Sequence, residues 1–171
     1  MPSLSHLDDS GAARMVDVGA KAITRREATA SGFLRLRPAT LDLIRRDAIA
    51  KGNVLAVARV AGIQAAKATS TLIPLCHHLP LSAVSVDFSL QPAGITLVAT
   101  ARTTSQTGVE MEVLTAVAVA ALTLYDMLKA VDAEMVIEGI QLNAKSKSPI
   151  ESQTGERGES TAIEDASRPD S

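Results

Sequence analysis

The order of predicted elements along this 171-residue chain indicates an α+β fold of the ferredoxin-like, split βαβ type. Three observations lead to this prediction. A long polar strand is followed by helical segments, two alternating stretches are joined by a short turn, and an apolar helix precedes a last strand. This order predicts an antiparallel sheet with helices packed on one face.

The first half of the chain predicts one strand and two helices. Residues 21–37 are rich in Thr and charge and end in apolar side chains, which is typical of one long strand or a bent pair. Pro38 opens a helix that runs to about residue 49, because proline at the first helical position presets φ. Asn53 is suited to cap a second helix that runs to about residue 67.

The second half predicts a hairpin, a helix and a strand. Apolar and polar residues alternate over 84–90 and 95–101 around Pro-Ala-Gly, which predicts a β-hairpin with one buried face. Residues 108–131 follow as an apolar helical pattern, and residues 137–142 are expected to form the last strand. A helix that is apolar on nearly all sides is expected to be buried on more than one side.

The composition of the chain predicts its domain boundaries and its cellular compartment. We expect a flexible arm over 1–14, a single α+β domain over 15–144, and a disordered polar tail over 145–171, where apolar residues are sparse. No apolar run approaches the ~20 residues of a membrane span, and the N-terminus lacks a signal-peptide core. With Cys76 as the single cysteine, a cytoplasmic protein is expected.

Charge is distributed unevenly. Residues 14–67 contain eleven Lys or Arg, whereas residues 110–138 contain six acids and one Lys. The two halves could attract each other, or the basic half could bind an anionic ligand. Nucleic acid is not expected as a partner, because only 2% of the residues are aromatic and no basic run is dense.

Four charged residues interrupt the apolar helix: Glu110, Glu112, Asp126 and Lys129. Asp126 and Lys129 are neighbours on the helix surface, so they form either an ordinary ion pair or a pair that exchanges protons. Glu112 and Asp126 are fourteen residues apart, which is ~21 Å along a helix. If both act on one small molecule, either the helix is broken between them or, as the more natural arrangement, the site is shared between subunits.

The loop over 72–81 contains Cys76, His77 and His78 between two prolines. Three interpretations compete for it: a metal site, a Cys-His nucleophile pair, and a non-catalytic loop with one hydrogen-bonding histidine. The last is favoured, because metal sites need three or four ligands and adjacent residues of an extended loop point apart. No resident metal is therefore predicted.

Basic residues could hold a phosphorylated ligand. Arg26, Lys51, Lys67 and Lys145 could converge on one pocket and neutralise phosphates, although Lys67 could also simply stabilise a helix C-terminus. The chain contains no P-loop and no GxGxxG motif, so side chains would have to bind any phosphate.

Five blocks of sequence identify a resemblance. They are MVDV (15–18), KGNVLAVARVAGIQAAK (51–67), LIPLCHHL (72–79), TGVEMEVLTAVAVAALTLYDMLKAV (107–131) and the strand that follows. Over about residues 5–145 the chain resembles the cyclic pyranopterin monophosphate synthase family, molybdenum cofactor biosynthesis protein C. The combination of LIPLCH, TGVEME and YDMxKAV is highly specific.

The resemblance implies a lyase that converts 3′,8-cyclo-7,8-dihydroguanosine triphosphate to cyclic pyranopterin monophosphate and pyrophosphate by Asp/Lys acid–base catalysis. It implies a ferredoxin-like homohexamer, a trimer of dimers, with the active site at a dimer interface. Catalytic roles are implied for Asp126, Lys129, Lys51 and His77. Substrate binding is implied for Leu75, Cys76, His77, Glu110, Met111, Glu112, Arg26, Lys67 and Lys145. No tightly bound cofactor is expected, although Mg²⁺ could accompany the triphosphate.

The chain departs from the family pattern in two places, and only the second, after Lys145, is expected to affect substrate binding. His78 follows the loop histidine, and the chain reads KSKSPIESQTG where the family has a glycine-rich segment after Lys145. The alternative is a catalytically impaired ferredoxin-like pterin- or nucleotide-binding or assembly module of the same family. A metal-dependent phosphohydrolase would require metal at Cys76 and His77.

Overall fold

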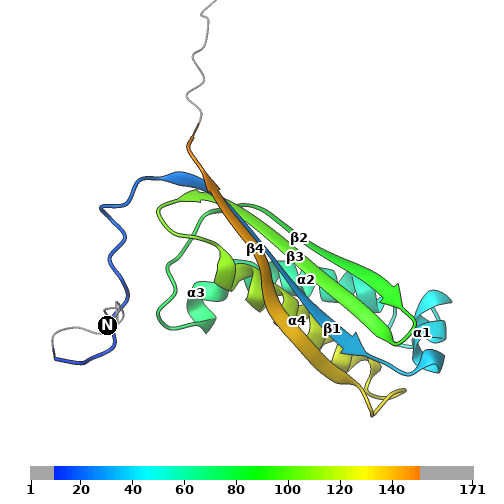
Figure 1. Ribbon diagram of the computed structural model, residues 1–171. Coiled ribbons are helices and arrows are strands. Elements are labelled where there is room, and N and C mark those ends of the chain that lie inside the picture. The colour runs from blue at the N-terminus through cyan, green and yellow to red at the C-terminus, as the bar shows by residue number, and fades with distance from the viewer. Residues whose placement is uncertain (1–9, 151–171) are drawn as a thin grey trace, which may run out of the picture.

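The computed structural model describes residues 10–150 and contains one four-stranded sheet with helices on one face (Figure 1). The elements in chain order are β1 (Thr24–Arg35), α1 (Pro38–Arg45), α2 (Val54–Lys67), α3 (Thr69–Leu72), β2 (Leu81–Gln91), β3 (Gly94–Ser105), α4 (Glu110–Leu128) and β4 (Val136–Ser148). The sheet order is β2-β3-β1-β4, and all three strand pairs are antiparallel. The predicted ferredoxin-like α+β fold is confirmed.

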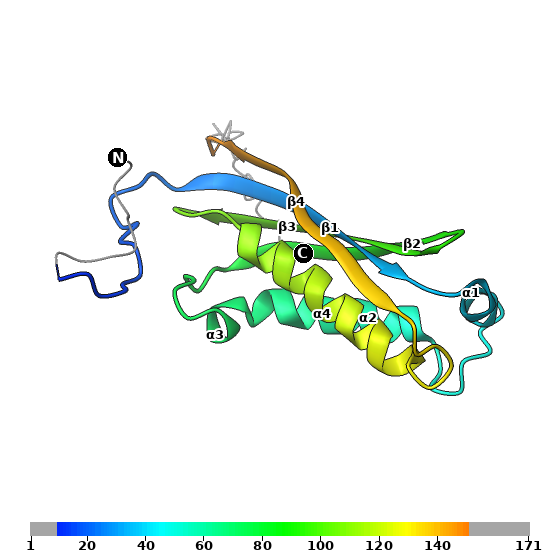
Figure 2. The same ribbon diagram turned by 60° about the horizontal axis from the view of Figure 1, so that its bottom comes forward.

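Helices α2 and α4 run side by side beneath the sheet (Figure 2). The alternation of β1 and β3 places small and aliphatic side chains toward these helices, including Ala30, Leu34 and Leu97, which are fully buried. The opposite face of the sheet is polar, as the Thr29 hydroxyl hydrogen bonded to the Thr100 hydroxyl shows. The core therefore lies between one sheet face and the two long helices.

Glycine allows the two helices to approach closely. A Cβ atom added at Gly62 of α2 would lie 2.9 Å from the Ala116 carbonyl oxygen and 3.2 Å from the Ala120 Cβ of α4. Asn53 caps α2 as predicted, because its side-chain oxygen accepts a hydrogen bond from the Ala56 backbone N–H. Helix α2 is thus fixed at its start and pressed against α4 at its middle.

Several predicted boundaries differ from the structure by a few residues, and the differences at α1 and β4 have clear causes. Helix α1 ends at Arg45 rather than near residue 49, and Asp47 adopts a left-handed backbone with φ of 52°. Strand β4 continues to Ser148, so residues 145–148 of the predicted tail belong to the sheet. Backbone pairing with β1 holds this polar sequence, whereas the prediction considered only the burial of apolar side chains. Most of the predicted arm and tail, residues 1–9 and 151–171, lies outside the described residues.

Helix α4 is long and apolar enough, by length and composition alone, to cross a membrane. Half of that stretch is buried within the domain itself, which is the behaviour of a core helix. Its outer side remains exposed in the single chain, where Leu122 has 59% of its surface accessible. The expectation that α4 is covered on more than one side is therefore only partly met.

Candidate active site

One group of predicted site residues lies at the C-terminal end of α4. Lys129 Nζ is 2.7 Å from Asp126 Oδ1, and Lys51 Nζ is 3.4 Å from Asp126 Oδ2. Lys51 also donates a hydrogen bond of 2.9 Å to the Asp126 backbone carbonyl. The antiparallel packing of α2 and α4 brings Lys51, just before α2, to this end of α4. We call these three residues the Asp126 cluster.

The two lysines set the protonation of the Asp126 cluster. Hydrogen bonds from Lys129 and then Lys51, together with their charges, lower the pKa of Asp126. The hydrogen bond and charge of Asp126 raise the pKa of Lys129. At neutral pH the carboxylate is therefore ionised and the Lys129 ammonium keeps its proton.

The Asp126 cluster is open to solvent in the single chain. The Asp126 side chain is 60% exposed and that of Lys129 is 58% exposed. In the described chain Asp126 and Lys129 therefore form a surface ion pair. Only a second molecule, or a bound ligand, could exclude water from them.

A second group of predicted residues lines a hollow of about 330 Å³ at the N-terminal end of α4. We call it the loop hollow. Its lining residues are Val16, Val18, Lys21, Leu75, Cys76, His77, Leu79, Thr107, Gly108, Glu110, Met111 and Glu112. The structure thus brings the loop 75–77 together with the start of α4.

Glu112 is the buried acid of the loop hollow, with 4% of its surface accessible. Burial raises its pKa, and the nearby charge of Glu110 raises it further, against the effect of its own backbone N–H. Burial also raises the pKa of the Cys76 thiol, and the charge of Glu112 adds to this. Cys76 therefore remains a protonated thiol, which does not suit a nucleophile.

His77 connects the loop hollow to the N-terminal segment. Its Nε2 lies 2.8 Å from the Val16 carbonyl oxygen. Because a carbonyl only accepts hydrogen bonds, Nε2 must carry a proton, and in the neutral ring Nδ1 is left as an acceptor. Val16 and Val18 were not predicted as site residues, although the MVDV block carried part of the resemblance.

A second hollow, also about 330 Å³, lies beside the loop hollow where β1 begins and β4 ends. We call it the strand-end hollow. Its lining residues are Arg26, Glu27, Gly108, Glu110, Lys145, Ser146 and Lys147. Glu110 and Gly108 line both hollows, so the two hollows adjoin each other.

An ion pair crosses the strand-end hollow. Lys145 Nζ lies 3.0 Å from Glu110 Oε1. Partial burial by itself would raise the pKa of Glu110, but the hydrogen bond and charge of Lys145, with the charge of Arg26, lower it. Arg26 is held by hydrogen bonds to the carbonyl oxygens of Ser105 and Gln106. The predicted residues Arg26, Glu110 and Lys145 are therefore neighbours.

The structure keeps the Asp126 cluster and the loop hollow apart. Glu112 and Asp126 lie on one continuous helix, α4, so the separation of ~21 Å persists. Lys67 ends α2, and the packing of Gly62 against Ala116 places that end of α2 near the start of α4. Lys67 lines none of the hollows described above.

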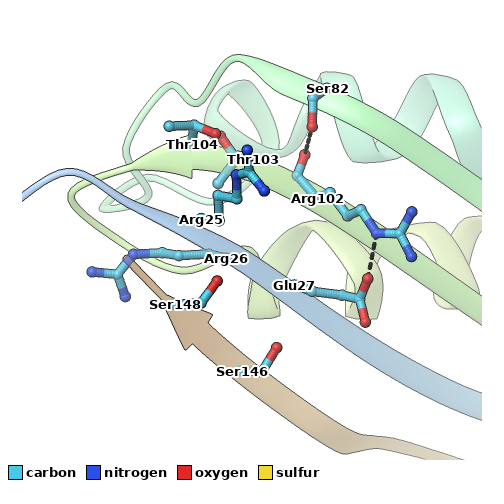
Figure 3. Close-up of a pocket in the computed structure, with 9 residues that line it drawn as sticks. All are labelled: Arg25, Arg26, Glu27, Ser82, Arg102, Thr103, Thr104, Ser146 and Ser148. Carbon is cyan, nitrogen blue, oxygen red and sulfur yellow. Dashed lines mark hydrogen bonds and ion pairs between the residues drawn. The ribbon is translucent and has the colours of Figure 1, made fainter. Parts of the chain in front are cut away.

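A larger hollow of about 420 Å³ lies at the same end of the sheet (Figure 3). It contains the ion pair between Arg102 and Glu27, on the side of the sheet away from the helices. Of the predicted site residues only Arg26 lines it. Within residues 10–150, no group of three or more His, Cys, Asp or Glu side chains is placed to hold a metal ion.

A model of one protein family, the MoaC family, matches residues 15–148 of this chain. The chain belongs to the MoaC family. A cyclic pyranopterin monophosphate synthase from Chloroflexus aggregans is 63% identical over 144 residues, which cover 83% of this chain and 87% of that protein. Proteins of the same name from Thermomicrobium roseum and Herpetosiphon aurantiacus are 60% and 55% identical, covering 85% and 84% of this chain and 89% and 88% of theirs. The family predicted from the sequence motifs is confirmed.

Proposed function

We propose that this MoaC family member is a cyclic pyranopterin monophosphate synthase of molybdenum cofactor biosynthesis. In this proposal it acts as a lyase on 3′,8-cyclo-7,8-dihydroguanosine triphosphate and releases pyrophosphate. The observation that carries the proposal is the Asp126 cluster, in which each carboxylate oxygen of Asp126 has its own lysine. These three residues occupy the positions that the sequence resemblance marks as catalytic.

The chemistry of the Asp126 cluster suits the rearrangement. Conversion of the substrate must move protons between ring nitrogens, ribose carbons and hydroxyls, which calls for an acid and a base within reach of each other. The Lys129 ammonium donates a proton, and the Asp126 carboxylate accepts one. Formation of the cyclic phosphate joins a substrate hydroxyl to the α-phosphorus as pyrophosphate leaves, and Lys51 stabilises the developing negative charge.

The exposure of the Asp126 cluster supports a site shared between two subunits. A lowered Asp126 pKa makes a weak base, and covering the cluster with a partner would desolvate it and raise that pKa. The outer sides of α2 and α4 expose Val60 and Leu122, at 60% and 59%, between the two ends of α4. A two-fold contact over these residues would join the Asp126 cluster of one subunit to the loop hollow of the other.

The proposed assembly is the homohexamer implied by the resemblance, a trimer of dimers whose active sites lie at the dimer interface. The enzyme is proposed to be cytoplasmic and to need no tightly bound cofactor. Mg²⁺ would accompany the triphosphate of the substrate as its counterion. Neither nucleic acid nor membrane is proposed as a partner.

The deciding experiment incubates the purified chain with 3′,8-cyclo-7,8-dihydroguanosine triphosphate and measures cyclic pyranopterin monophosphate and pyrophosphate. Both products are expected in equal amounts. Tight binding of the substrate without either product would contradict the proposal and favour the impaired binding or assembly module. Activity that depends on a metal bound at Cys76 and His77 would favour the phosphohydrolase instead.

A further inference from the structure

The end of β4 presents two lysines to the same side of the sheet. In the antiparallel register Lys145 lies opposite Ala28 and Lys147 lies opposite Arg26. Because side chains alternate along a strand, Lys145 and Lys147 share the side of Arg26 and buried Ala28, which faces the helices. The intervening Ser146 and the following Ser148 belong to the opposite side, where Figure 3 shows them with Glu27.

The three cations of the strand-end hollow differ in how far they are already engaged. Lys145 is paired with Glu110 at 3.0 Å. Arg26 donates hydrogen bonds of 3.1 and 2.9 Å to two backbone carbonyls, which fix its guanidinium without neutralising its charge. For Lys147, the described residues 10–150 offer its ammonium no hydrogen bond and no ion pair.

The charges in the strand-end hollow do not cancel. Its lining contains three cations and two carboxylates, Glu27 and Glu110. Glu27 is already paired with Arg102, which lies outside this hollow, and Glu110 is paired with Lys145. Arg26 and Lys147 are left as an uncompensated pair of positive charges on adjacent strands. Such an arrangement favours an anion with more than one charge.

We infer that Lys147 is a phosphate-binding residue that acts with Arg26 and Lys145 on the polyphosphate part of the substrate. The identity of that substrate rests on the proposed function, whereas the affinity of the hollow for polyphosphate does not. At about 330 Å³ the hollow is within the size range of small-molecule sites. Lys147 is a flexible point charge, so it can follow a phosphate that the fixed Arg26 guanidinium positions.

The test measures binding of inorganic tripolyphosphate to the full-length wild-type chain and to Lys147→Gln by titration calorimetry at low salt. We expect Lys147→Gln to weaken binding about fivefold and Lys147→Arg to retain most of it. Arg46→Gln is the matched charge control, since it removes one positive charge beyond α1, at the far end of the molecule from the end of β4 (Figure 1). Ser148→Ala controls for disturbance of the strand end.

The outcomes separate this inference from the proposed function. Equal tripolyphosphate affinities of wild type and Lys147→Gln, or no binding by wild type, would overturn the role of Lys147 even if the enzyme is active. If Lys147→Gln loses affinity for tripolyphosphate while the two control variants keep it, the role of Lys147 is supported even if wild type forms no product. In an active enzyme, Lys147→Gln should raise KM about fivefold and leave kcat nearly unchanged.

Discussion

Lys129 Nζ and Asp126 Oδ1 are 2.7 Å apart at the exposed C-terminal end of α4, where Lys129 directly follows the helix. Exposed ion pairs at this spacing contribute little to stability. The pair therefore has a weak structural role in the single chain. We therefore expect the pair to act on a ligand, and we expect substitutions in it to have little effect on folding.

Asp126→Asn is expected to lower turnover by about 10²- to 10⁴-fold, because the amide cannot accept a proton. The thermal midpoint of unfolding should stay close to that of wild type. Asp42→Asn is the matched control, since Asp42 also pairs with a basic residue three positions away, Arg45 at 2.9 Å, on an exposed helix. Product formation by Asp126→Asn at the wild-type rate would remove the carboxylate from the mechanism.

Mixing two variants with impaired activity tests whether the site is shared. Asp126→Asn and Glu112→Gln damage opposite ends of α4. If each site takes one end from each subunit, a mixed dimer contains one intact site, so random mixing should restore about a quarter of wild-type activity. The measurement unfolds and refolds the two variants together and compares them with each variant refolded alone. No recovery in verified mixed oligomers would place both ends in one subunit's site.

Glu112→Gln is expected to stabilise the single chain at neutral pH while reducing substrate binding. Burial raises the Glu112 pKa above its unfolded value, so the folded state holds this proton more tightly. The destabilisation by ionised Glu112 is absent below the unfolded pKa of ~4.3 and grows as pH rises toward and through the folded pKa. Urea unfolding of both proteins from pH 4 to 8 should show a difference that increases with pH. A pH-independent difference would argue against this explanation.

Asp132 is expected to be a stabilising residue outside the active site. Its buried carboxylate accepts hydrogen bonds from the Arg37 and Glu134 backbone N–H groups and from the Thr40 hydroxyl, which ties the end of α4 to the start of α1. Asp132→Ala leaves these donors unpaired and should lower the free energy of unfolding by about 2–3 kcal/mol. Glu134→Ala, an exposed neighbour, should have an effect below about 0.5 kcal/mol.

The contribution of Asp132 should also depend on pH. Burial alone would raise its pKa, but the hydrogen bonds and the charge of Arg37 lower it. The stabilisation is therefore present above the unfolded pKa of ~3.9 and is lost as pH falls through the lower folded pKa. Wild type and Asp132→Asn should converge in stability as the solution is acidified below about pH 4. Divergence in that range would contradict the assigned hydrogen bonds.

Much of the fold could be predicted because its signals are local. The alternation of apolar and polar residues predicted the hairpin of β2 and β3. Asn53 predicted the start of α2, because its side chain accepts a hydrogen bond from a backbone N–H only three residues later. The end of β4 could not be predicted in this way. Its polar residues are held by backbone hydrogen bonds to β1, which lies more than 100 residues earlier in the chain. The local composition does not indicate which strand these residues pair with.

The site was predicted in its residues more fully than in its geometry. The number of residues between Glu112 and Asp126 was sufficient to predict that they lie at opposite ends of the helix. The approach of Lys51 to Asp126, 75 residues apart, depends on how α2 lies against α4, which periodicity does not specify. The hydrogen bond from His77 to Val16 was missed for the same reason. Each depends on a neighbour that only the folded chain supplies.

The contact between Gly62 and Ala116 packs α2 tightly against α4. The length of α4 therefore sets the distance between the two groups of site residues at its ends. Removing a single residue between Glu112 and Asp126 would shorten α4 by ~1.5 Å and rotate one end against the other by ~100°. Apolar substitutions along α4 would change neither its length nor the relative rotation of its two ends. The composition of α4 can thus vary where its packing against α2 and the sheet permits, whereas the number of its residues cannot change without moving one end against the other.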